Sequence, residues 1–271
     1  MRFAYRKEFA TEPLARVLQQ RGWIVMAYDD PAQALLDHSA DIVLTPALDY
    51  ARNVGIVDYA LTPGVGIVTS GFAGVNKLLF KPGLTDFTTI ATRDVSSSDT
   101  MIARIVLSEK HNIEPTFIAA PAASVEEMLK RADAAFLAGD DAVFDLTGMH
   151  SYLDLTDEWE DLSGTPLPYM IAWGRVGLVD EAMLADFTSA RDAAVLTIAD
   201  SAARHAHSAE ANAFYERYLR GSIRYTLEDA DLVGLDALYR FAFYYALVSD
   251  VPSIKYLPDG EPANIPEPPI T

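Results

Sequence analysis

Short apolar runs alternate with helical patterns from the N-terminus onward, and this alternation limits the chain to an α/β fold. Residues 2–5 and 22–29 are apolar runs of strand length, and a helical pattern begins between them at Thr11. Thr11 is a suitable cap for that helix, and Pro13 suits its first turn. The same order continues with a helix at 31–40 and strands at 41–46, 58–70 and 84–94. Strands that alternate with helices of this size indicate largely parallel sheets.

The middle of the chain repeats this order with a second set of elements. A helix with a hydroxyl-rich start is expected at 96–110, a strand at 115–120 and a strand entering a polar turn at 133–143. Between the two strands, Ser124 followed three residues later by Glu127 is the pattern of a capping box at the start of a helix. These segments predict a second compact α/β unit.

We therefore expect one chain folded into two lobes, with strands crossing between them near residues 90 and 174. Lobe I comprises residues 1–90 and 175–271, and lobe II comprises residues 91–174. From about residue 176 the patterns are mainly helical, and the Pro-rich tail 257–271 is expected to be loose.

Composition excludes several classes of partner. The 271 residues carry a formal net charge of -18 and have a pI near 4.5, whereas a surface that neutralises phosphates needs an excess of Lys and Arg. We therefore expect no nucleic-acid partner and no binding to an anionic membrane. No run reaches the length of a membrane span, and the N-terminus has no apolar signal core, so we expect a cytoplasmic protein.

Motifs of cofactor and metal chemistry are missing from the sequence. There are no cysteines, and "SGFAGVNK" lacks the spacing of a phosphate-binding loop. The sequence has no G-x-S-x-G elbow and no H-E-x-x-H helix. His205 and His207 are two apart on a predicted helix and so do not share a face. A reaction on a small anion, without a cofactor or a metal, is what these findings leave.

Hydroxyl-bearing residues follow several predicted strands or start the next helix. They lie at Ala10–Thr11, at Thr45–Ala47, at Thr69–Gly71 and at Ser97–Thr100. In α/β proteins ligands bind beyond the carboxyl ends of the strands, and helix starts bind anions through free N–H groups and the helix dipole. The sequence therefore predicts an anion-binding cleft, although the same residues are also ordinary caps and turn residues.

The order of motifs resembles one family, the chorismate dehydratases of menaquinone biosynthesis by the futalosine pathway. The motifs that carry the resemblance are "DIVLTPALDY", "GIVTSGFAGVNKLLF", "RDVSSSDTMIARIVL", "AGDDAV", "LDLTDEWEDLSGTPLPYMIAW" and "YLRGSIRYTLEDADLVGLDALYRFA". The resemblance implies a two-lobed type II periplasmic-binding-protein-like fold. In that fold the sheets would be mixed and mostly parallel with helices on both faces, a ligand cleft would lie between the lobes, and the C-terminal region would be helical.

The resemblance also implies an activity. It is a cofactor-free lyase reaction in which chorismate loses water to give 3-[(1-carboxyvinyl)oxy]benzoate, in a monomer or homodimer without a metal. Ser70 and Thr11 are the expected catalytic residues. The expected substrate-binding residues are Thr45, Thr69, Gly71, Asn76, Ser97, Ser98, Asp99, Thr100, Asp140 and Trp173.

One departure from the family leaves alternatives open. The family's Ser-Tyr-Leu-Asn-Thr-x-Pro-Leu stretch, whose Asn is implicated in the chemistry, corresponds here to "KEFATEPL", with Ala10 at the Asn position and Lys7 at the Ser position. Ala10 has no side-chain hydrogen bond to offer. The chain is then either a dehydratase with a slow or rearranged site, a lyase for another carboxylate, or a binding protein for a small carboxylate without catalysis.

Overall fold

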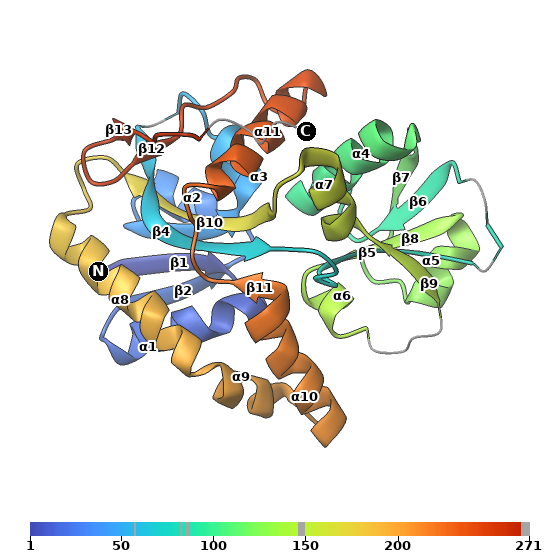
Figure 1. The fold of residues 1–271 in the computed structure, drawn as a ribbon, viewed down its shortest axis with the longest axis horizontal. Helices are drawn as coiled ribbons and strands as arrows, with labels where there is room; N and C mark the ends of the chain where they lie inside the picture. Colours follow the sequence, from blue (N-terminus) through green and yellow to red (C-terminus); the bar gives the residue numbers. More distant parts are fainter. Residues whose placement is uncertain (57, 82, 85–86, 146–149, 267–271) are drawn as a thin grey trace. The chain divides into compact units, whose positions relative to one another are not determined.

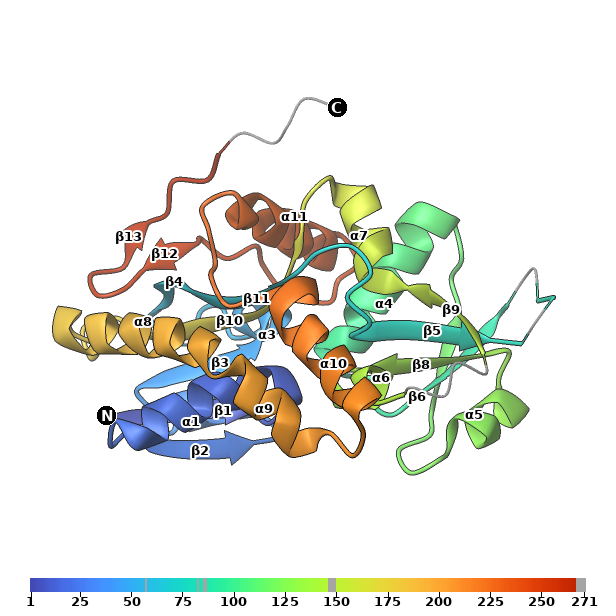
Figure 2. The ribbon, with the colours of Figure 1, turned by 60° about the horizontal axis from the view of Figure 1, so that its bottom comes forward.

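The computed structural model describes residues 1–56, 58–81, 83–84, 87–145 and 150–266. The chain divides into two compact units, of which the first comprises Met1–Thr69 and Leu167–Thr271 and the second comprises Ser70–Pro166. Figures 1 and 2 show the two units as ribbons. The second unit is thus a continuous segment inserted into the first.

The first unit is built on an eight-stranded sheet in the order β13-β12-β4-β10-β3-β1-β2, with β11 also paired to β4. Its strands are β1 (Arg2–Arg6), β2 (Ile24–Tyr28), β3 (Ile42–Pro46), β4 (Tyr59–Thr69), β10 (Leu167–Arg175), β11 (Ile223–Arg224), β12 (Lys255–Tyr256) and β13 (Glu261–Pro262). Strand β10 runs antiparallel to both β3 and β4 and lies between them.

Helices cover both faces of this sheet, as Figures 1 and 2 show. On one face Phe3 of β1 packs against Phe187 of α8, and on the other Trp173 of β10 packs against Tyr50 of α3. The unit contains α1 (Glu12–Gln20), α2 (Pro31–Leu36), α3 (Ala47–Arg52), α8 (Glu181–Leu196), α9 (Ile198–His205), α10 (Ala209–Arg217) and α11 (Asp231–Tyr244), a 3-10 turn η1 (Phe9–Thr11) and a π-helical turn η2 (Tyr218–Ser222).

The second unit is built on a five-stranded sheet in the order β7-β6-β8-β5-β9. Its strands are β5 (Asn76–Phe80), β6 (Thr89–Thr92), β7 (Thr116–Ala119), β8 (Ala134–Ala138) and β9 (Ser151–Asp154), and its helices are α4 (Ser98–His111), α5 (Val125–Arg131), α6 (Asp140–Val143) and α7 (Leu155–Ser163). The predicted capping box begins α5, since the Ser124 N–H donates to the Glu127 carboxylate at 2.9 Å and the Glu127 N–H donates to the Ser124 hydroxyl.

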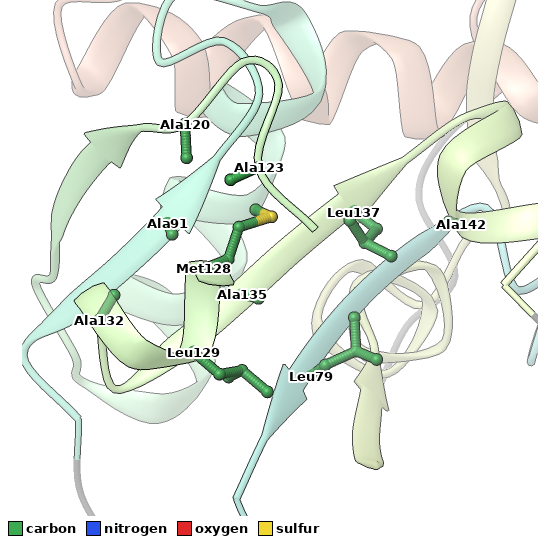
Figure 3. Close-up of a cluster of buried hydrophobic side chains, with 10 residues drawn as sticks. All are labelled: Leu79, Ala91, Ala120, Ala123, Met128, Leu129, Ala132, Ala135, Leu137 and Ala142. Atoms are coloured by element: carbon green, nitrogen blue, oxygen red, sulfur yellow. The ribbon is translucent and has the colours of Figure 1, made fainter. Parts of the chain in front are cut away.

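An apolar cluster holds α5 against this sheet, and Figure 3 shows its side chains. Met128 of α5 is fully buried among alternate residues of the strands, which include Leu79, Ala91 and Leu137. Alternate strand residues point to opposite faces, so this cluster defines the α5 face of the sheet. On the other face the hydroxyls of Thr92 and Thr100 lie 3.2 Å apart, at the start of α4. Helices therefore cover both faces of this sheet as well.

Three expectations about the fold need correction. Residues 70–90 belong to the second unit rather than the first, because β5 pairs with β8 and β9; the second boundary falls at 166/167 rather than at 174/175. The sheets are mixed but not mostly parallel, since six of the eleven strand pairs among the described residues are antiparallel.

The Pro-rich tail is more ordered than expected. Within it β13 pairs with β12, although residues 267–271 lie outside the described part of the chain. Among the described residues, no helix has the length and apolar character that a membrane span requires.

Candidate functional site

Strand ends carrying the predicted residues gather at one edge of the first unit's sheet. Strand β1 pairs in parallel with β3, and β10 brings the end of β4 to the same level, since Met170 is opposite both Pro46 and Ile67. Thr45 and Thr69 therefore lie at the carboxyl edge of this sheet, and the turn that contains Thr11 follows β1 at the same edge.

The predicted hydroxyls at this edge are buried and engaged within the protein. Thr11 is 0% exposed, and its hydroxyl lies 2.7 Å from the Glu8 carbonyl oxygen and accepts the Glu8 N–H at 3.0 Å. Thr69 donates to the Leu167 carbonyl at 3.3 Å. Thr11 thus closes the turn ahead of α1 and makes no side-chain cap bond to the helix, contrary to its expected capping role.

Thr45 and Trp173, both predicted to bind the ligand, form a buried hydrogen-bonded pair. The Trp173 indole N–H donates to the Thr45 hydroxyl at 2.9 Å, and both side chains are 0% exposed. Trp173 also packs against Tyr50 and Tyr59. These contacts make the pair part of the core of the first unit.

Ser70 is different, because its hydroxyl is exposed and held by a carboxylate. It donates to Glu160 Oε2 of α7 at 2.9 Å, and the Gly71 N–H donates to the same oxygen at 2.7 Å. Gly71 has a φ of +56°, which favours glycine at this turn. Among the predicted site residues, Ser70 is the one whose side chain is exposed.

The loop from Ser70 to Gly74 is fastened to the first turn of α7 by further hydrogen bonds. The Gly74 N–H donates to Asp154 Oδ2 at 2.7 Å, and the Thr156 hydroxyl donates to the Gly71 carbonyl at 3.0 Å. Phe72 at the middle of the loop is 73% exposed. The acidic run "DLTDEWED" therefore orients the loop that carries Ser70.

The predicted anion loop at the start of α4 uses its polar groups locally. The Ser97 hydroxyl accepts the Thr100 N–H at 3.1 Å, and the Thr100 hydroxyl donates to the Asp94 carbonyl at 2.7 Å. Ser98, Asp99 and Thr100 are 1–3% exposed. The Ser97–Thr100 bond is the N-cap that the capping interpretation of this motif predicts.

Asn76 is a fully buried amide that has no hydrogen-bond partner among the described residues. It begins β5, is 0% exposed, and neither its Oδ1 nor its Nδ2 is bonded. Asn76 is three residues from Leu79, so it lies on the opposite face from the α5 cluster and on the same face as the start of α4. An unsatisfied buried amide costs about 1–3 kcal/mol and calls for an explanation.

Asp140, predicted to bind the substrate, lies among charged residues of the second unit that are bonded within the protein. Asp140 begins α6 and is half-buried, and its neighbour Asp141 accepts from Arg93 Nε at 2.7 Å. Lys77 donates to the carbonyls of Ala142 and Asp145 at 2.7 and 3.2 Å. Burial lowers the pKa of Lys77, with the nearby carboxylates acting in the opposite direction.

Two acidic groups of the loop's support have raised pKa values. Burial raises the pKa of Asp154, against the hydrogen bonds that it accepts from Thr156 and Gly74. Desolvation also raises the pKa of Asp157, and the carboxylates of Asp161 and Glu158 add to this. Asp154 and Asp157, at the start of α7, therefore hold protons more readily than ordinary aspartates.

A buried charged cluster lies beside the position where the family has Asn. Ala10 itself is 1% exposed. Glu8, two residues before it, is ion-paired with Arg6 at 2.6 Å and accepts the Tyr169 hydroxyl at 3.1 Å. Glu12, two residues after Ala10, is bonded through its carboxylate to His205 at 2.5 Å and lies 3.4 Å from Arg204.

The sequence patterns do not mark Glu8, Glu160 or Phe72 as candidate site residues. Glu8 is at the family's Tyr position and Glu160 is inside an acidic run, so neither has a spacing that marks it. Phe72 follows Ser70-Gly71 in an apolar stretch, and the pattern does not reveal its exposure. Among the described residues no group of three or more His, Asp or Glu side chains is arranged to hold a metal ion.

Structure comparison identifies the fold. The periplasmic aliphatic sulphonate binding protein SsuA from Escherichia coli has a TM-score of 0.68 at 17% identity, over 93% of this chain and 94% of that one. Protein AF1704 from Archaeoglobus fulgidus has a TM-score of 0.62 at 17% identity, over 91% and 98%. The Candida albicans CA3427 gene product, described as having the generic periplasmic binding protein fold, has a TM-score of 0.56 at 11% identity, over 92% and 91%. The predicted type II periplasmic-binding-protein-like fold is confirmed.

Sequence comparison identifies the family. No curated protein matches the chain. The family model described as menaquinone biosynthesis matches residues 25–244, which is most of the chain. The match confirms, at the level of this family, the resemblance found in the order of motifs. The chain therefore belongs to the menaquinone biosynthesis family.

Proposed function

We propose that this protein is a chorismate dehydratase-like lyase, which converts chorismate into 3-[(1-carboxyvinyl)oxy]benzoate. The observation that carries the proposal is the exposed Ser70 hydroxyl, held by Glu160, in a chain of the menaquinone biosynthesis family. Ser70 lies at the carboxyl edge of a strand, where α/β proteins bind their ligands. The resemblance to the dehydratases implies a serine of the site at this position, which supports the proposal.

The reaction needs a proton acceptor and a hydrogen-bond donor, and the Ser70–Glu160 pair contains both. The Glu160 carboxylate takes the proton from the ring carbon next to the one that bears the hydroxyl. The C–H electron pair becomes a ring double bond while the C–O bond breaks. Hydroxide leaves with a hydrogen bond from Ser70 and receives the proton from Glu160, so water is released and the carboxylate is regenerated.

The ligand's other parts have candidate contacts in the second unit. Phe72 offers an exposed aromatic face to the ring. Asn76 has amide groups without partners in the described chain, on the face where α4 begins. A ligand carboxylate that reached Asn76 would satisfy its Nδ2, which explains why such a costly group is kept.

The test is direct. Purified protein is incubated with chorismate, and the product is followed by its aromatic absorbance and identified by mass. Conversion that is abolished in S70A, with an unchanged thermal unfolding midpoint, supports the proposal. No conversion by intact, folded protein that still binds chorismate would instead support a carboxylate-binding protein, the alternative that Ala10 favours.

A further inference from the structure

The two edges of the first unit's sheet differ in how well they are protected against pairing with another chain. At one edge lies β13, which is two residues long and consists of a glutamate and a proline. At the other lies β2, which is five residues long, uncharged and without proline, "IVMAY" (Figure 2). Short length, charge and proline are means by which edge strands avoid other chains. Strand β2 therefore offers its open side to a partner strand.

The backbone groups on that open side belong to Val25 and Ala27. Strand β2 pairs in parallel with β1, and the Ile24 N–H donates to the Met1 carbonyl at 3.0 Å. Successive residues of a strand direct their backbone groups alternately to its two sides, so those of Met26 also face β1. The N–H and C=O groups of Val25 and Ala27 face away from the sheet.

The side chains of β2 form an exposed apolar strip on one face of the sheet. Val25 pairs with Phe3 of β1, which packs against α8, so Val25 lies on the α8 face. Ile24, Met26 and Tyr28 lie on the opposite face. Ile24 is 59% exposed and Tyr28 38% exposed, and the Tyr28 hydroxyl lies 3.7 Å from Met26 Sδ. An apolar strip on an open edge is typical of an interaction site.

Two charged side chains beside this edge have no partner among the described residues. Arg16 of α1 is half-buried and lines a groove together with Val25 and Ala27. Asp29 follows β2 directly and is exposed. Neither side chain has a hydrogen bond or an ion pair within the described part of the chain. A half-buried guanidinium next to an apolar strand favours a carboxylate that is brought to it.

A second copy of β2, running antiparallel to the first, matches these features. With the symmetry axis at Met26, Val25 of one copy is opposite Ala27 of the other. Because these are the residues whose backbone groups face outward, they form the hydrogen-bonded pairs of the new ladder. On the other face of the sheet, Ile24 of one copy is opposite Tyr28 of the other, which makes an apolar cross-strand pair.

The same register also brings opposite charges together. Asp29 of one copy comes opposite Trp23 of the other, and the alternation of side chains puts it on the α8 face, where Arg16 lines the groove. Symmetry makes this contact at both ends of the strand pair. A parallel arrangement would instead bring the two copies of Asp29 together. The charges therefore favour the antiparallel pair.

We propose that the protein forms a homodimer through β2, in which two eight-stranded sheets join and Arg16 of each copy pairs with Asp29 of the other. The inference is independent of the proposed function, since none of these residues is assigned to the reaction. Because the interface consists of one strand and its neighbours, the dimer is expected to be reversible, with a Kd of about 1–100 µM.

The experiment is sedimentation velocity of the full-length protein over this concentration range. The salt is set to about 0.15 M, at which the repulsion between two copies of charge -18 is screened beyond about 8 Å. I24K is expected to raise the Kd about tenfold or more, because it places a charge in the apolar strip. The matched control is L178K, which replaces an apolar side chain of similar exposure, 56%, and is expected to leave the Kd unchanged. Leu178 is remote from β2, since the neighbouring Gly177 N–H donates to the Pro258 carbonyl, next to β12.

A charge exchange tests the register. R16E and D29R each bring like charges together in a homodimer, so each is expected to raise the Kd about tenfold. In a heterodimer of one R16E chain and one D29R chain, opposite charges face each other at both contacts. An equimolar mixture of the two variants is therefore expected to regain the affinity of the wild type, a result that misfolding of either variant would not produce.

Three results would overturn the inference. They are a wild-type chain that stays monomeric above this concentration range, a dimer that I24K and L178K affect equally, and a mixture of R16E and D29R that associates no better than either variant alone. Chorismate turnover, measured on the same samples, reports on the proposed function separately. A dimer without turnover would leave the inference standing, and turnover by a monomer would leave the proposed function standing.

Discussion

In the first unit, Thr45 and Thr69 end strands with hydroxyls that are fully buried and bonded inside the protein. In the second unit, the very next residue, Ser70, exposes its hydroxyl and shares it with a carboxylate of α7. Residues of the same chemistry, adjacent in the chain, thus differ in exposure and in hydrogen-bond partner. Whether a strand-end hydroxyl is structural or available depends on its neighbours, which belong to distant parts of the chain.

The strongest test of this contrast removes the proposed proton acceptor, Glu160, from the second unit. E160Q is expected to lower kcat for chorismate about 100-fold or more, because Gln keeps the contact with Gly71 but accepts no proton. The control is D161N on the next residue of α7, an exposed carboxylate paired with Lys110. Equal kcat values for E160Q and D161N would contradict the assignment.

Replacing the two adjacent hydroxyls separates activity from stability. S70A is expected to lower kcat about 100-fold with little change in the urea midpoint, since its side chain is exposed. T69V is expected to keep kcat and to lower the free energy of unfolding by about 1 kcal/mol, because the bond to the Leu167 carbonyl is lost. A large loss of kcat in T69V, measured at saturating chorismate, would contradict the assignment of Thr69 to stability and Ser70 to activity.

Restoring the family's Asn tests the buried edge of the first unit. A10N is expected to lower the free energy of unfolding by about 1–3 kcal/mol, since an amide would be placed where the side chain is 1% exposed. A10S, with a smaller polar group, serves as the comparison. A rise in chorismate turnover without a loss of stability would show that position 10 is open to the ligand.

In the second unit, Asn76 is the reverse of Ala10, because it is already a buried amide without a hydrogen-bond partner among the described residues. N76L is expected to raise the free energy of unfolding by about 1 kcal/mol, because an unsatisfied amide is replaced by an apolar group of similar size. It is also expected to lower chorismate affinity, which titration calorimetry would measure. A destabilised N76L that binds chorismate normally would mean that the amide is satisfied by water.

The smallest expected effect concerns acid stability. Hydrogen bonds from the N–H groups and hydroxyls of Thr88 and Thr89 lower the pKa of Asp133 from 3.8 to about 2. Its contribution to stability is therefore full above about pH 4 and is lost as the pH falls toward 2. D133N should flatten this part of the stability curve, measured by urea unfolding between pH 2 and 5. Asp154 acts in the opposite direction. Burial raises its pKa, so the folded protein disfavours the charged form and loses stability as the pH rises through the range in which Asp154 ionises.

The alternation of apolar runs and helical patterns was enough to predict the fold class and the insertion of one unit into another. The predicted first boundary, at residue 90, was wrong by about 20 residues, because the sequence "VNKLLF" does not show which strands it pairs with. Only the long-range ladder with β8 and β9 places it in the second unit. Capping patterns such as Ser124–Glu127 were predictable, since both partners are close in sequence.

The site was less predictable than the fold. The sequence indicated which strand ends carry hydroxyls, and Ser70 stays a candidate on that basis. It did not indicate that Trp173 faces Thr45, that Glu160 reaches Ser70, or that Tyr169 reaches Glu8, because these contacts join residues 90 or more apart. Nor does spacing reveal that the Asn76 amide has no hydrogen-bond partner among the described residues.

The position of β10 has a consequence for how the chain is made. This strand pairs with both β3 and β4, yet it begins at Leu167, after the whole of the second unit. During synthesis on the ribosome, strands within the first 69 residues therefore have unpaired edges for roughly 5–20 s, which is the time needed to synthesise the inserted segment. The second unit contains all five strands of its own sheet and has no such delay. Nascent chains that stall within the insertion would expose β3 and β4 to aggregation, so this stretch of translation is where chaperones would be needed most.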